Sequence, residues 1–152
     1  MNHITISAES PYSLDAAQLM SELSDMLQEI TGDSGRGSFD IGMMNDPGSI
    51  FVIARNEAGE AIGCGAIRPI NGSIAEVKRM YAKYQSQGIG TAILSYLEEQ
   101  ATKLGYSAIW LETRAVNEQA VRFYERNGYQ RIPNYGKYAG NHEAVCFEKS
   151  LI

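Results

Sequence analysis

The stretch from Ala75 to Thr91 limits most strongly what this chain can fold into. It reads A-E-V-K-R-M-Y-A-K-Y-Q-S-Q-G-I-G-T, a strand pattern followed by a turn and a helix start that carries glycines. Gly88 and Gly90 leave backbone amides uncovered where the helix begins. Free N–H groups and the positive end of a helix dipole together bind phosphate. The stretch therefore predicts a strand–turn–helix unit with an anion site made from backbone.

Hydrophobic periodicity predicts further elements on both sides of this unit. The expected helices are 14–31, 88–104 and 117–127, and the expected strands are 3–7, 50–55, 61–68, 74–82, 107–113, 129–132 and 144–149. Residues 33–48 are expected to form a loop, and Asn71-Gly72 a two-residue hairpin. A helix between strands 74–82 and 107–113 predicts that these two strands run parallel. The pattern indicates a single mixed α/β domain over residues 1–152.

Composition narrows the class of protein. A net charge of −5 and a pI near 5.0 disfavour nucleic acid as a partner, because affinity for phosphate backbones comes from clustered Lys and Arg. The longest apolar run, residues 50–54, is far shorter than the roughly 20 residues of a membrane helix. No signal peptide is recognisable at the start. We expect a cytoplasmic protein without membrane contact.

Few residues in the sequence are suited to metal or disulfide chemistry. Cys64 and Cys146 lie on separate apolar segments and are expected to be buried as small hydrophobic side chains. His3 and His142 have no spacing typical of metal ligands. The sequence predicts no metal site.

Two motifs resemble those of the GNAT superfamily, the acyl-CoA-dependent N-acetyltransferases. Residues 85–90, Q-S-Q-G-I-G, resemble the family's Gln/Arg-x-x-Gly-x-Gly/Ala pyrophosphate loop. Residues 117–129, N-E-Q-A-V-R-F-Y-E-R-N-G-Y, resemble the Asn-x-x-Ala-x-x-Phe-Tyr-Glu-x-x-Gly-Phe/Tyr segment that follows it. The two occur in order and are separated by one strand, and the resemblance covers residues 50–129 well. Short glycine motifs recur by chance, so the pair carries more weight than either motif alone.

The resemblance implies a single GNAT-like domain of the α/β (α+β) class. Its sheet would be mixed and mostly antiparallel, with about six or seven strands, a central parallel pair that splays apart, and helices on both faces. A bulge near Met80 would turn a backbone N–H toward a thioester carbonyl. A homodimer is compatible with this fold.

The co-substrate implied by the resemblance is acetyl-CoA, held without a metal. The residues expected to contact it are Met80, Tyr81, Ala82, Gln85, Gln87, Gly88, Ile89, Gly90, Thr91, Asn117 and Tyr124.

Two residues are candidates for the chemistry. Glu76 stands where several family members carry a glutamate that removes a proton from the amine, and Tyr124 matches the tyrosine that protonates the CoA sulfur. Each has a purely structural alternative. Glu76 could be a surface carboxylate paired with Lys78 or Arg79, and Tyr124 could be an aromatic residue packed beneath its helix.

The acceptor is expected to be the primary amine of a small molecule or peptide. Arg36 could bind a substrate carboxylate, and Tyr135 and Tyr138 could form the wall of an amine pocket. The predicted activity is acetyl transfer from acetyl-CoA to this amine by direct attack. The alternative is a non-catalytic module that binds or senses acyl-CoA. A nucleotide-binding domain is disfavoured, because neither Gly-x-x-x-x-Gly-Lys-Ser/Thr nor Gly-x-Gly-x-x-Gly occurs.

Overall fold

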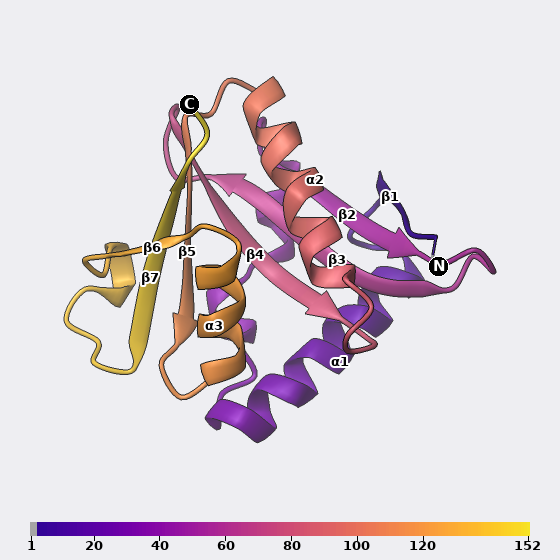
Figure 1. Cartoon of the computed structure of the whole chain (residues 1–152), viewed down its shortest axis with the longest axis horizontal. Coiled ribbons are helices and arrows are strands. Elements are labelled where there is room, and N and C mark those ends of the chain that lie inside the picture. Colours follow the sequence, from indigo (N-terminus) through magenta and orange to yellow (C-terminus); the bar gives the residue numbers. More distant parts are fainter. Residues whose placement is uncertain (1–2) are drawn as a thin grey trace.

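The computed structural model describes residues 3–152, and the fold is built on one seven-stranded sheet (Figure 1). The strands are β1 (Thr5–Ala8), β2 (Ile50–Arg55), β3 (Ala61–Pro69), β4 (Ile74–Ala82), β5 (Ala108–Arg114), β6 (Gln130–Ile132) and β7 (Ala144–Ser150). Their order across the sheet is β1-β2-β3-β4-β5-β7-β6. The sheet is antiparallel except between β4 and β5, which run parallel. The predicted mixed sheet with one central parallel pair is confirmed.

Three α-helices and three short 3-10 turns complete the chain. They are α1 (Leu14–Thr31), α2 (Ile89–Lys103), α3 (Glu118–Arg126), η1 (Arg36–Ser38), η2 (Ile41–Asn45) and η3 (Gly136–Tyr138). The helix ends follow the sequence signals. Ser13 Oγ accepts a hydrogen bond from the Ala16 amide, and Gly32 ends α1 in the left-handed region with φ 80°.

The helices cover both faces of the sheet, as predicted. On one face, α2 and α3 pack side chains such as Ile93, Leu97 and Val121 against the strands, and Figure 1 shows both helices in front of the sheet. On the other face, Leu19 of α1 packs on Ile53 of β2. The sheet is thus buried on both sides where α1 and α2 cover it.

Two glycines of β3 let α2 approach the sheet closely. A Cβ on Gly63 would lie 2.7 Å from the Tyr81 carbonyl oxygen and 2.8 Å from side-chain atoms of Ile89 and Ile93. A Cβ on Gly65 would lie 2.7 Å from Met80 Sδ. Any side chain at these positions would therefore push the start of α2 away from β3.

The parallel pair β4–β5 separates half-way along its length. Cα pairing between the two strands extends only from Ile74 to Glu76 on β4, although β4 continues to Ala82. A bulge lies just beyond this point, because β4 shifts register against β3 between Cys64 and Ala66 and Arg79 has φ 55°. The structure therefore contains the predicted splay, with a bulge at Arg79–Met80.

The turn between β3 and β4 differs from the sequence prediction. Asn71-Gly72 was expected to form a two-residue hairpin, but the Ile70 amide donates to the Ile74 carbonyl across three intervening residues. The Asn71 side-chain oxygen accepts hydrogen bonds from the Ser73 and Ile74 amides. This side-chain contact stabilises the longer turn and is the physical reason for the difference.

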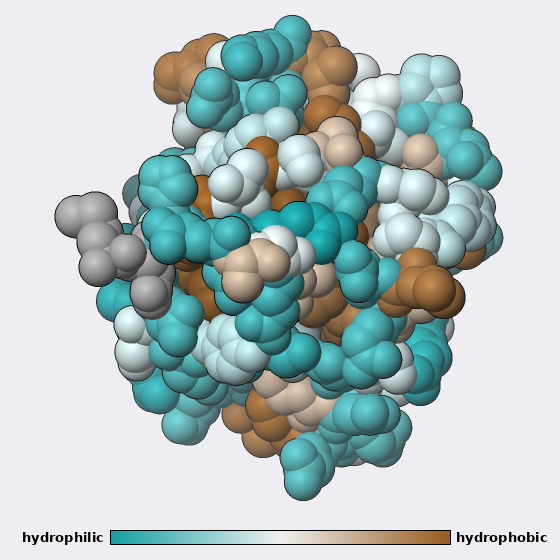
Figure 2. Space-filling model, turned by 90° about the vertical axis from the view of Figure 1, so that its right-hand side faces the viewer, coloured by the Kyte–Doolittle hydropathy of each residue, from teal (hydrophilic) through white to brown (hydrophobic). Residues whose placement is uncertain are grey.

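The surface is ordinary for a folded domain. On the face seen in Figure 2, hydrophobic residues form separate small groups within a mostly hydrophilic surface. Across residues 3–152, no helix combines the length and the apolar character needed to pass through a bilayer.

Candidate active site

The splay between β4 and β5 opens into a cavity of about 580 Å³. Both separated strand halves line it, from Val77 to Ala82 on β4 and from Glu112 to Arg114 on β5. The first turns of α2 and α3 border it at one end, and the loops after α1 and around η3 border it at the other. We call these the α2 end and the loop end of the cavity.

The α2 end is made largely from backbone. Gly88, the residue before α2, has φ 74°, and no side chain caps the helix. The amides of the first helical turn have no partner within the helix, so they are available to an anion. Ser86 also has a positive φ, of 62°, which keeps the preceding turn tight. This end therefore has the helix start with uncovered amides that the sequence predicts.

Gly90 has a packing role as well. A Cβ there would lie 3.1 Å from the Phe123 ring, so glycine permits α2 and α3 to meet beside the cavity. Gln85 is tied to α3, because Gln119 Nε2 donates to Gln85 Oε1 at 2.8 Å. The glycine loop and α3 therefore form one continuous wall.

Asn117 and Tyr124 of the second motif both reach the cavity. Asn117 is buried and caps α3, with its Oδ1 accepting from the Ala120 amide. Tyr124 packs among the rings of Phe123, Tyr129 and Phe147. The same side chain also lines the cavity, so it combines the two alternatives that the sequence left open. Burial raises the pKa of Tyr124, and the charge of Glu112 raises it further, so the hydroxyl stays protonated at neutral pH.

Glu76 is the last residue of β4 that pairs with β5 before the two strands separate. It is only 4% exposed, and it is absent from the described residues that line the cavity. Arg68 Nη1 donates to its Oε1 at 3.0 Å, and Lys78 Nζ lies 3.6 Å from the same oxygen. The Tyr135 hydroxyl donates to its Oε2 at 2.5 Å. Both carboxylate oxygens of Glu76 are therefore already engaged.

A second carboxylate, Glu112, lines the cavity itself. It stands on β5 two residues beyond Trp110, the last position paired with β4, and its side chain is 11% exposed. Burial raises the pKa of Glu112, although the charges of Arg114 and Lys78 oppose this rise. Its charge also reaches Tyr124. Glu112 and Tyr124 thus line the same cavity, and the sequence did not single out Glu112.

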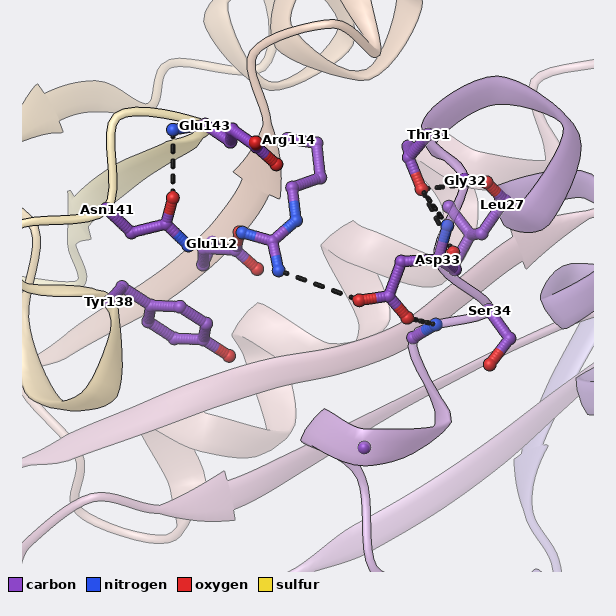
Figure 3. A network of polar contacts seen from close by, with 12 residues as sticks. Leu27, Thr31, Gly32, Asp33, Ser34, Glu112, Arg114, Tyr138, Asn141 and Glu143 are labelled. Atoms are coloured by element: carbon purple, nitrogen blue, oxygen red, sulfur yellow. Dashed lines mark hydrogen bonds and ion pairs between the residues drawn. The ribbon is translucent and has the colours of Figure 1, made fainter.

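Arg114 connects β5 to the loop after α1 at the loop end (Figure 3). Its Nη1 lies 3.1 Å from Glu112 Oε2, and its Nη2 lies 3.9 Å from Asp33 Oδ2. Asp33 is held in place by the Gly35 amide, which donates to Asp33 Oδ1 at 2.9 Å. The network bridges segments that are far apart in the sequence and borders the loop end of the cavity.

The three predicted acceptor residues lie in different places. Tyr138 lines the cavity at the loop end. Tyr135 does not line the cavity; its ring lies against Trp110 at a tilt of 50°, and its hydroxyl donates to Glu76. Arg36 is exposed and lines a separate hollow beside Arg79, so the structure does not bring it together with the other two.

Ten of the eleven residues expected at the co-substrate line the cavity: Met80, Tyr81, Ala82, Gln85, Gly88, Ile89, Gly90, Thr91, Asn117 and Tyr124. Gln87 is the exception. It is exposed and does not line the cavity.

The two cysteines are buried, as expected, and neither lines the cavity. Burial raises the pKa of Cys64 to about 12, and its thiol donates to the Arg79 carbonyl. Burial also raises the pKa of Cys146. Both thiols stay protonated at neutral pH and are poor nucleophiles.

Comparison with known proteins identifies the family. Residues 16–129 match the acetyltransferase (GNAT) family. The chain belongs to the GNAT family. An IAA acetyltransferase of Azospirillum brasilense is 30% identical over 99% of this chain and the whole of that protein. An N-acetyltransferase of unassigned function from Schizosaccharomyces pombe is 31% identical over 88% of this chain and 87% of that protein.

Solved structures show the same GNAT fold. A Klebsiella pneumoniae protein assigned to the acyl-CoA N-acyltransferases superposes with a TM-score of 0.81, at 29% identity and 98% coverage of both chains. An aminoglycoside 6'-N-acetyltransferase complexed with coenzyme A superposes with a TM-score of 0.68, at 20% identity and 97% coverage of both chains. GNAT membership and the relatives support acyl-CoA-dependent acetyl transfer.

Proposed function

We propose that this protein transfers an acetyl group from acetyl-CoA to the primary amine of a small molecule or peptide. The observation that carries the proposal is the β4–β5 cavity, which joins a helix start without a side-chain cap to a largely buried carboxylate, Glu112, and a buried tyrosine, Tyr124. A site that only bound acyl-CoA would not need an acid–base pair at its centre. The pair therefore favours an enzyme over a sensing module.

The residues at the α2 end fit a coenzyme A pyrophosphate. The uncapped amides of α2 and the positive helix end would hold its negative charge. The unpaired edges of β4 and β5 beyond Glu76 offer backbone groups along the splay, where the pantetheine arm would lie. The bulge at Arg79–Met80 would direct a backbone N–H of β4 toward the thioester oxygen.

We propose Glu112, rather than Glu76, as the direct general base. The amine must lose a proton as its nitrogen bonds to the acetyl carbon and the carbon–sulfur bond breaks. Glu112 lines the cavity and has a raised pKa, whereas Glu76 is held by Arg68, Lys78 and Tyr135 below it. In this proposal Glu76 has an indirect role: its carboxylate holds Lys78 and Tyr135 in position through an ion pair and a hydrogen bond. Tyr124 supplies the proton to the leaving thiolate.

An amine panel tests the proposed function. Acetyl-CoA is incubated with amino acids, polyamines, aminoglycosides and peptides, and thiol release is followed together with product mass. We expect at least one amine to gain an acetyl group, and coenzyme A to bind more tightly than ATP or NAD. Tight binding of coenzyme A without transfer to any amine would replace the proposal by the sensing module.

Replacing Tyr124 by phenylalanine should lower kcat about tenfold and leave acetyl-CoA binding nearly unchanged, because a thiol is already a fair leaving group. The measurement is steady-state kinetics together with equilibrium binding of coenzyme A. Tyr129→Phe is the matched control, since that hydroxyl donates to Glu98 and does not line the cavity. An unchanged kcat in Tyr124→Phe across the pH range would remove Tyr124 from the mechanism.

A further inference from the structure

Two lysines face the loop end of the cavity from different segments. Lys78 stands on β4 and Lys137 in η3, and both line the cavity. Their Nζ atoms lie 5.5 Å and 5.6 Å from the centre of the same Tyr138 ring. Lys78 Nζ also donates to the Tyr138 hydroxyl at 2.9 Å. Two lysine ammonium groups thus contact the same tyrosine ring at the loop end.

The charge of Lys137 is not balanced by a neighbouring carboxylate. Within residues 3–152, no carboxylate lies within 4.0 Å of Lys137 Nζ, which contacts the Gly37 carbonyl oxygen at 3.4 Å. Lys78 shares the single charge of Glu76 with Arg68. Burial lowers the pKa of Lys78, the charge of Glu76 opposes this change, and the charge of Lys137 adds to it, so the two lysines repel each other across this end of the cavity.

The local charge is opposite in sign to that of the whole protein. The cations Lys78, Lys137 and Arg114 surround the loop end, while the chain as a whole carries −5. Arg114 is compensated by Glu112 and Asp33, as Figure 3 shows for the Asp33 side, but Lys137 is not. A ligand with one negative charge would complete this arrangement.

We infer that the acceptor carries a carboxylate close to its amine and binds it between Lys137 and Lys78. This inference rests on the proposed function and assigns its substrate class, an amino-acid-like molecule. The amine of such an acceptor points to Glu112, whose charge reaches both Lys78 and Tyr138. Because the lysines and Glu112 share one end of one cavity, the two groups of the substrate are separated by only a few bonds.

The test compares free amino acids with their amides, in which the carboxylate is replaced by a neutral carboxamide. Transfer from acetyl-CoA is measured as kcat/KM near neutral pH, where the lysines keep their charge, for α-, β- and γ-amino acids and their amides, and each value is divided by the fraction of that amine that is deprotonated. We expect the acids to be preferred about tenfold, the value of one charge-assisted hydrogen bond. Lys137→Gln should remove most of this preference by lowering kcat/KM for the acids only.

The control is Lys103→Gln, which removes the same charge from an exposed position on α2 paired only with Glu99. It should keep the preference. Three results would each overturn the inference while leaving acetyl transfer established. The amides could react as well as the acids, or phosphoethanolamine could react better than the amino acids. Lys137→Gln could also lower kcat/KM equally for acids and amides. Failure of every amine to react would overturn the proposed function, and this inference with it.

Discussion

Replacing Glu112 by glutamine should lower kcat/KM about a hundredfold near neutral pH, because general-base catalysis typically contributes at least this factor. A base works only when deprotonated, so the rate of the wild-type protein should fall as pH drops through the pKa of Glu112. Burial raises that pKa, and the fall should therefore begin at a higher pH than for an exposed glutamate. In Glu112→Gln this decrease of kcat/KM at low pH, the low-pH limb of the profile, should disappear. The measurement is kcat/KM across the pH range.

Glu76→Gln is the matched control, since it makes the same change one strand away and outside the cavity lining. It should keep the low-pH limb with the shape seen in the wild type. It can also lower stability, because it removes a charge that pairs with Arg68 and Lys78, so thermal unfolding is measured beside the kinetics. A limb lost in Glu76→Gln but kept in Glu112→Gln would make Glu76 the base.

Replacing Gly63 by alanine should destabilise the fold by about 1–3 kcal/mol, the usual cost of overpacking a core. The added Cβ would lie 2.7 Å from the Tyr81 carbonyl oxygen, a backbone atom that can move only if β4 moves. It would also lie 2.8 Å from Ile89 and Ile93 of α2. For a domain of this size each kcal/mol lowers Tm by about 2–4 °C. Thermal and urea unfolding measure the effect.

Gly72→Ala provides the comparison for this change. Gly72 is exposed in the turn before β4, and a Cβ there would meet nothing within 4 Å. Its free energy of unfolding should stay within about 0.5 kcal/mol of the wild type. If Gly63→Ala unfolds at the same temperature as Gly72→Ala, the close approach of α2 to β3 is not a constraint on stability.

The fold was largely predictable because its signals are local. Ser13 and Gly32 mark the ends of α1, and short continuous runs of apolar residues mark strands such as β2 and β5. The insertion of β7 between β5 and β6 was not predictable, since it depends on pairing between distant segments. The turn after Ile70 was missed because a side-chain hydrogen bond decided its length.

The two ends of the cavity differed in how far the sequence revealed them. The α2 end comes from one continuous stretch and one motif, and all but Gln87 of its expected residues line the cavity. The loop end combines residues such as Asp33, Lys78 and Lys137, which no spacing in the sequence links. The sequence did contain an indication of Glu112. It is a carboxylate directly after the buried Ile109 and Leu111, in a strand that leads to the second motif, and it lies on the face opposite to Leu111.

Because β7 lies between β5 and β6, the chain leaves the sheet after β6 and returns to its interior through the segment 133–143. The strands β4 and β5 supply Lys78 and Glu112 at the loop end of the cavity, and the rest of that end comes from segment 133–143 and the loop after α1, which contribute no strand to the sheet. Insertions or changes of length in them break no strand pairing, whereas changes in the glycine loop alter the start of α2. The loops at the loop end can thus change in length without altering the sheet, whereas the α2 end depends on the start of a helix that is packed against it.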